Sequence, residues 1–120
     1  MIGINPQGEV HGYVAAVLNL YLRLPETPFN ASSNDRQTAA ALHTRGVTLF
    51  AAESALMLAS VRRLGISPDM PPLSPIRSLA YFLPVIQELL DNPIPEDYLG
   101  CLRLKMYSLS SRKGLKAKCG

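Results

Sequence analysis

One stretch of seventeen residues, Thr48 to Leu64, constrains the fold more than any other part of the chain. At about 100° per residue, its large apolar side chains point in nearly every direction around a helix. They are Leu49, Phe50, Leu56, Met57, Leu58, Val61 and Leu64. A helix that is apolar on all sides is buried. We therefore expect this helix at the centre of the fold, surrounded by other segments.

The ends of this central helix carry residues that favour helix termini. Thr48 can accept a hydrogen bond from the free amides of the first turn, and Gly65 suits the position after the last turn. The two arginines before Gly65 place positive charge at the negative end of the helix dipole. Glu53 and Ser60 lie seven residues apart and share a face of the helix. We expect that face to look outward.

Four other segments carry helix signals, so the expected total is about five helices. In these segments apolar residues recur every three or four positions, or capping residues and prolines mark the ends. The predicted helices are residues 9–24, a short helix capped by Asn34 or Asp35 and ending near Arg45, residues 75–90 capped by Ser74, and a helix after Pro95 that buries Tyr98, Leu99, Leu102, Met106 and Leu109.

Pro84 interrupts the predicted helix over residues 75–90. Its ring excludes the hydrogen bond to the carbonyl of Ala80, which costs about 3 kcal/mol in a helix interior. The sequence therefore predicts a kink or a split near residues 81–83. Such a bend either wraps the segment around the central helix or acts as a hinge, and the wrapping interpretation is favoured.

These signals predict an all-α fold, a compact bundle of about five helices around a buried central helix, with one helix kinked by proline. No stretch shows the polar–apolar alternation of a half-buried strand. A chain of 120 residues with 48% apolar content suits one domain with one core. We expect that domain over residues 1–108 and a basic, flexible tail over residues 109–120.

The sequence lacks the residue groupings of catalytic and metal sites. There is no metal-ligand spacing among the two histidines and two cysteines, which are His11, His43, Cys101 and Cys119. No glycine-rich phosphate loop and no nucleophile with its base is evident. We therefore expect no enzyme activity, no metal and no cofactor, and we expect the cysteines to be free thiols rather than a disulfide.

Two features of the sequence bear on location. The apolar stretches are shorter than the roughly 18 to 20 residues that a membrane span requires. The N-terminus has no basic run before its apolar segment, so it does not resemble a signal peptide. We expect a cytoplasmic protein with no membrane partner.

Residues 45–48 join two predicted helices through a tight turn with glycine at the bend, as in a helix-turn-helix. A DNA-reading helix needs polar or basic side chains in its first turns to reach base edges. Here those positions hold Leu49, Phe50, Ala51, Ala52 and Glu53. A helical hairpin in the core is therefore favoured over a DNA reader.

Two stretches carry a resemblance to known proteins. They are LHTRGVTLFAAESALMLASVRRL and SPIRSLAYFLPVIQELL with the following PEDYLGCLRLKM. Both look like parts of small all-helical bacterial proteins of uncharacterised function, and the second more distantly resembles helical domains of replication-initiation proteins. The resemblance covers roughly residues 39–107. It implies a bacterial or mobile-element setting, and no catalytic residue is carried over from it.

Basic residues are concentrated at the C-terminus. Residues 1–97 hold six basic and nine acidic residues, whereas residues 98–120 hold six basic and none acidic. Clustered lysines and arginines bind phosphates, and an interleaved tyrosine can stack on a base. We therefore predict a small nucleic-acid-associated accessory protein whose contact residues are Arg103, Lys105, Tyr107, Arg112, Lys113, Lys116 and Lys118. The resemblance described above implies a link to replication or mobile elements.

The competing hypothesis is a helical protein–protein interaction module, or a homodimer, without nucleic-acid binding. It rests on the excess of large apolar side chains in a small chain. If Phe50, Met57, Tyr81 and Phe82 are not all enclosed, the remainder forms an exposed apolar patch. The sequence keeps both hypotheses open.

Overall fold

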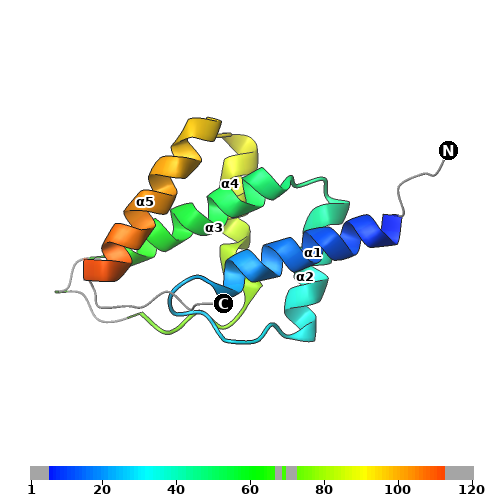
Figure 1. Cartoon of the computed structure of the whole chain (residues 1–120), viewed down its shortest axis with the longest axis horizontal. Helices are drawn as coiled ribbons and strands as arrows, with labels where there is room; N and C mark the ends of the chain where they lie inside the picture. Colours follow the sequence, from blue (N-terminus) through cyan, green and yellow to red (C-terminus); the bar gives the residue numbers. More distant parts are fainter. Residues whose placement is uncertain (1–5, 67–68, 70–72, 113–120) are drawn as a thin grey trace.

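The computed structural model describes residues 6–66, 69 and 73–112 of the chain. These residues form five α-helices and one short 3-10 helix, and none of them lies in a strand. In chain order (Figure 1) the elements are α1 (Pro6–Leu22), α2 (Ser33–Thr44), α3 (Leu49–Leu64), the 3-10 helix η1 (Leu79–Phe82), α4 (Leu83–Asp91) and α5 (Glu96–Arg112). The prediction of an all-α fold is confirmed.

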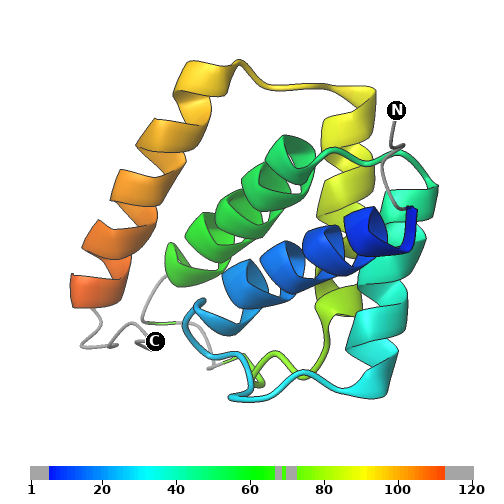
Figure 2. The ribbon, with the colours of Figure 1, turned by 45° about the vertical axis from the view of Figure 1, so that its right-hand side comes forward.

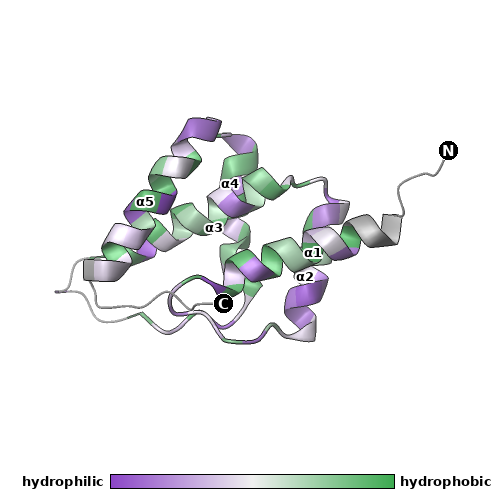
Figure 3. Cartoon of the chain, in the orientation of Figure 1, coloured by the Kyte–Doolittle hydropathy of each residue, from purple (hydrophilic) through white to green (hydrophobic). Residues whose placement is uncertain are grey.

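The helix α3 lies at the centre of the bundle, as the sequence predicts. It packs against α1, α4, α5 and η1, and Figure 2 shows it between α5 and α4. Hydrophobic residues follow α3 along its length, whereas α2 is mostly hydrophilic (Figure 3). The largest fully buried apolar side chains, drawn from five elements and the segment after α1, are Tyr21, Leu24, Leu42, Leu56, Leu79, Phe82 and Ile86.

The face of α3 that carries Glu53 and Ser60 does not look outward, so that prediction is wrong. Ser60 is buried, and α5 packs on α3. The carboxylate of Glu53 accepts hydrogen bonds from Nε and Nη2 of Arg103 at 2.8 and 2.6 Å. The carboxylate of Glu53 need not face solvent, because the guanidinium of Arg103 from the neighbouring helix α5 neutralises its charge.

The start of α2 differs from the prediction, whereas its end agrees with it. Ser32, not Asn34 or Asp35, is the N-cap, and the predicted cap is therefore wrong. The Ser32 hydroxyl accepts a hydrogen bond from the Asp35 amide, and the Asp35 carboxylate accepts one from the Ser32 amide, both at 3.0 Å. At the other end Gly46 has a φ of 79°, which suits a stop residue. Thr48 caps α3 as predicted.

The segment around Ser74 is not helical, so the prediction that Ser74 caps a helix is wrong. Residues 73–78 contain no helix. Long-range hydrogen bonds hold this backbone instead. The guanidinium of Arg63 donates to the Ser74 carbonyl, and the Ile76 amide donates to the Glu26 carbonyl at 3.0 Å.

Pro84 splits its segment at the predicted place. The 3-10 helix η1 ends at Phe82, and α4 begins at Leu83 with Pro84 in its first turn. In that position the missing amide of proline removes no helical hydrogen bond. The chain therefore changes helix type near residues 81–83 instead of bending one continuous helix.

The four large side chains that the sequence identifies as a possible patch have different surroundings. Met57 and Phe82 are buried, and Phe50 is partly buried. Tyr81 is partly exposed, but its ring lies 5.6 Å from the guanidinium carbon of Arg63 and packs edge-on against Phe82. These four residues therefore do not form one apolar patch.

Candidate functional site

The helix α5 lies at one edge of the molecule and packs mainly on α3 (Figures 1 and 2). Leu99, Leu102 and Met106 are buried, as the spacing predicts. The sequence also predicts Tyr98 in this buried face, but Tyr98 is 44% exposed, so that assignment is wrong. Tyr98 lies at the margin of the buried face of α5, because it points about 100° away from Leu99 around the helix.

Three of the predicted nucleic-acid contact residues have described side chains on α5. Arg103 forms an ion pair with Glu53 of α3, with 2.6 Å between Nη2 and Oε2. Lys105 is exposed, and Tyr107 is 55% exposed. Residues two apart on a helix point about 200° apart, so Lys105 and Tyr107 do not share a face.

The other four predicted contact residues lie at the end of the chain. Arg112 is the last residue of α5, so the tail predicted over residues 109–120 includes the last turn of a helix. Lys113, Lys116 and Lys118 lie outside the described residues.

Ion pairs reduce the positive charge that the folded surface offers to a polyanion. Three arginines each donate to a glutamate at N–O distances of 2.6 to 2.7 Å, and the pairs are Arg62–Glu88, Arg63–Glu26 and Arg103–Glu53. The hydrogen bond from Arg62 lowers the pKa of Glu88. Lys105 has no such carboxylate partner among the described residues.

A second side of α5 exposes apolar residues to solvent. Gly100, Leu104, Tyr107 and Ser111 recur at positions i, i+4, i+7 and i+11, which places them along one side of a helix. Leu104 is 73% exposed and Tyr107 is 55% exposed. We call these four residues the α5 outer face. Arg103 flanks this face, but its guanidinium is held by the carboxylate from α3.

The backbone of α5 is open at Gly100. Apart from its chain neighbours and the backbone of its own helix, a Cβ atom placed on Gly100 would meet nothing within 4 Å. The helix therefore has an accessible shallow position one turn before Leu104 and two turns before Tyr107. Single exposed apolar residues are ordinary on protein surfaces. A spacing of i, i+4 and i+7 on one helix, however, is typical of helices that bind another helix.

The turn between α2 and α3 does not present a DNA-reading helix. The central helix α3 packs against α1, α4 and α5. In its first two turns Ala52, Ser54 and Ala55 are buried, and Glu53 is engaged by Arg103. This packing argues against a DNA reader, but α2 packs on α1 and η1 rather than on α3, so the predicted helical hairpin of these two helices is wrong.

The described part of the chain offers few residues for a metal site, a reactive thiol or a membrane span. No three His, Cys, Asp or Glu side chains in it are grouped as metal ligands. Cys101 is an exposed free thiol on α5. Among the described helices, none has the length and hydropathy needed to cross a membrane.

Sequence reasoning did not identify the α5 outer face, although a signal was present. Leu104 lies off the stripe formed by Leu99, Leu102 and Met106, since it is about 200° around the helix from Met106. A large apolar residue at such a position, one turn after a glycine, marks a second apolar side of the helix.

Comparisons with protein-family models, curated proteins and solved structures found no match to this chain. The choice between functions therefore depends on the geometry of α5.

Proposed function

We propose that this protein is a helical interaction module that self-associates through the α5 outer face. The observation that carries this proposal is the exposure of Leu104 and Tyr107 side by side on a helix at the edge of the molecule. Exposed apolar residues at helical spacing gain free energy when a second helix covers them. The ion pair of Arg103 with Glu53 supports the proposal, because it draws the neighbouring charge away from this face.

A second copy of the chain suits this face because the face is self-complementary. In an antiparallel pair of α5 helices related by a two-fold axis between residues 103 and 104, Tyr107 lies opposite Gly100 of the partner subunit. The same contact recurs with the subunits exchanged, as an isologous interface requires. The open backbone at Gly100 gives the tyrosine ring room. Leu104 then lies beside the axis, close to its own copy.

Changing Leu104 to glutamate tests this proposal. The substitution would place two carboxylates next to each other at the centre of the interface, where buried charge is costly. Each would lie opposite Arg103 of the partner subunit, but the carboxylate of Glu53 already holds that guanidinium. We expect the dissociation constant of the dimer to rise by roughly 100-fold, which is the effect of removing a central contact residue. Light scattering after size-exclusion chromatography measures this directly, over a range of protein concentrations.

Tyr98→Glu is the matched control, because Tyr98 is also an exposed apolar residue of α5 but lies off the outer face. It should leave the dimer intact. If Leu104→Glu and the wild-type chain have the same mass at every concentration while both are folded, the α5 outer face does not mediate self-association.

Nucleic-acid binding is the second candidate function, and one specific observation favours it. Lys105 and Tyr107 are exposed on a helix that carries no acidic residue after Asp97. The chain beyond α5 adds Lys113, Lys116 and Lys118. Such a segment can contact phosphates and stack on a base. The link to replication or mobile elements stays a prediction from the resemblance alone.

Removing residues 113–120 tests this second candidate while it leaves all of α5 in place. Three lost phosphate contacts should reduce the slope of log affinity against log salt concentration by roughly 3 for duplex DNA. We expect an unchanged melting temperature, because no part of the described core is removed. Fluorescence anisotropy with a labelled duplex at several salt concentrations gives the slope.

The variant Lys105→Gln is the control for this measurement, since one lost contact should reduce the slope by only about 1. An affinity and a slope that do not change on removal of residues 113–120 would exclude the C-terminal lysines as the phosphate-binding group.

A further inference from the structure

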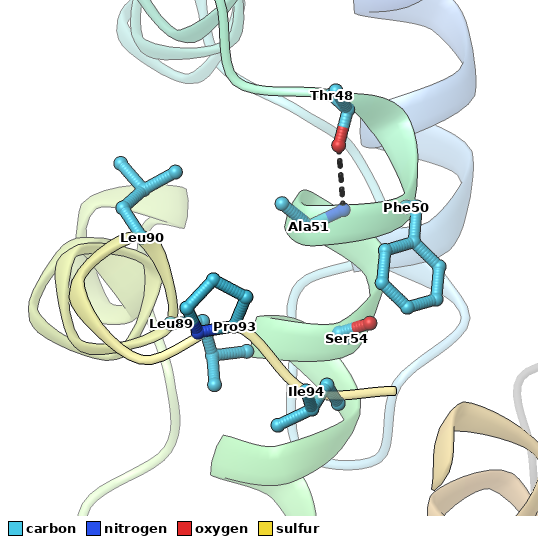
Figure 4. Close-up of a pocket in the computed structure, with 8 residues that line it drawn as sticks. All are labelled: Thr48, Phe50, Ala51, Ser54, Leu89, Leu90, Pro93 and Ile94. Carbon is cyan, nitrogen blue, oxygen red and sulfur yellow. Dashed lines mark hydrogen bonds between the residues drawn. The ribbon is translucent and has the colours of Figure 1, made fainter. Parts of the chain in front are cut away.

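A pocket of about 210 Å³ opens between the start of α3 and the end of α4. Figure 4 shows the side chains that line it. Phe50, Ala51 and Ser54 come from α3, and Leu89 belongs to α4. Ile94, which lies in the connection to α5, closes the pocket from below in this view.

The walls of this pocket are apolar and uncharged. None of the described residues that line it is Asp, Glu, Lys, Arg or His. A charged ligand would lose its hydration there without gaining an ion pair, so the pocket favours a neutral molecule. An apolar cavity of about 150 Å³ is large enough for benzene. The present pocket therefore has room for one aromatic ring with a small substituent.

One buried polar group distinguishes this pocket from a simple packing defect. The Ser54 side chain is 0% exposed, and its hydroxyl has no hydrogen-bond partner among the described residues. In Figure 4 it projects from α3 between Phe50 and Ile94, both of which line the pocket. A serine inside a helix can point to solvent or bond to a carbonyl one turn earlier, and the buried Ser54 does neither. A buried hydroxyl without a partner is unfavourable, so a ligand atom that bonds to it gains affinity.

The rim of the pocket offers a second polar atom. The Thr48 hydroxyl accepts a hydrogen bond from the Ala51 amide at 3.1 Å. Its own hydrogen is not used by this bond, because the oxygen is the acceptor. The pocket thus combines apolar walls with two hydroxyl groups, Ser54 in the wall and Thr48 at the rim.

We propose that this pocket binds a small neutral aromatic molecule that carries one hydroxyl group, of the phenol class. The ring lies against Phe50, Leu89 and Ile94. Because the Ser54 oxygen is fully enclosed in this structure, its side chain rotates toward the pocket to bond with the ligand hydroxyl. This site is separate from the α5 outer face and does not depend on self-association, because none of the four outer-face residues lines the pocket.

A pair of probes that differ only in the hydroxyl group tests this inference. We expect p-cresol to bind the wild-type chain about 2- to 10-fold more tightly than toluene, which is the ordinary value of one neutral hydrogen bond. Ser54→Ala should remove this preference, so that both probes bind equally. Ala51→Leu should fill the pocket and weaken the binding of both. Isothermal titration calorimetry and chemical-shift perturbation give the affinities and the location.

The Ser54→Ala variant keeps the experiment decisive, because replacing an unpartnered hydroxyl by hydrogen is not expected to unfold the chain. Circular dichroism of each variant checks this. Two results would overturn the inference. One is the absence of binding of both probes to the wild-type chain at millimolar concentration. The other is a preference for p-cresol that persists in Ser54→Ala.

Discussion

Replacing Leu56 by aspartate is expected to unfold the protein. Leu56 is 0% exposed and lies in α3, which packs against most of the other helices. The substitution removes a large apolar side chain from the core, at about 2 to 5 kcal/mol, and places an unpaired carboxylate there. The combined loss is comparable to the whole stability of a small domain, about 5 to 15 kcal/mol. Far-ultraviolet circular dichroism and a thermal melt measure the result.

Leu49→Asp is the matched control, in the same helix and with the same change of residue. Leu49 is exposed in the first turn of α3, where a negative charge favours the positive end of the helix dipole. We expect a nearly native melt. A cooperative, near-native melt of Leu56→Asp would show that α3 is not the centre of the core.

Replacing Asp35 by alanine has the second largest expected effect. The carboxylate is 1% exposed and accepts two hydrogen bonds. One comes from the Ser32 amide in the capping box of α2, and the other from the Leu79 amide at the start of η1, both at 3.0 Å. Leaving two amides without an acceptor costs about 1 to 3 kcal/mol each, more where burial is complete. We expect a loss of about 3 kcal/mol in the free energy of unfolding, measured in urea.

Asp35→Asn removes the charge but keeps one of the two acceptor oxygens, so it distinguishes the effect of the charge from that of the hydrogen bonds. We expect a smaller loss of stability than for alanine. A free energy of unfolding that is the same for wild type and Asp35→Ala would show that neither capping box nor η1 depends on this carboxylate.

The ionisation of Tyr21 gives an independent measure of the Asp35 charge. Burial, and to a lesser degree the charge of Asp35, raises the pKa of Tyr21 to about 12. The unfolded value is near 10, so the folded state keeps a proton that the unfolded state has lost. Stability from this group is therefore present below pH ~10 and is lost as the pH rises toward ~12. Asp35→Asn should lower the pKa of Tyr21, as read from ultraviolet absorbance.

Local signals predicted the central helix, its start at Thr48 and the end of the preceding helix α2 at Gly46. Thr48 and Gly46 act through their own backbone geometry and nearest amides, which the sequence alone determines. Pro84 likewise changes the helix at the predicted place, because its ring excludes a bond within one turn.

Predictions failed where a distant residue decides the local structure. Ser74 precedes a proline and resembles a helix cap, but hydrogen bonds to Arg63 and Glu26 hold its segment in a non-helical conformation. The face of α3 around Glu53 looks polar in sequence, yet Arg103 from a helix fifty residues later covers it. No pattern within one helix contains this information.

The candidate site was predicted only in part. The sequence identified α5 and its basic end, and it identified self-association as an alternative. It did not show that Arg103 is engaged or that Leu104 is exposed, because both depend on which side of α5 meets α3.

Sedimentation equilibrium of the unmodified chain is the most direct test of self-association through α5. The monomer has a mass of 13.1 kDa. If the α5 outer face binds a second copy, the average mass rises toward twice this value between roughly 5 and 500 µM, the range in which micromolar dimers form. A mass that stays at 13.1 kDa at every concentration would contradict the proposed function.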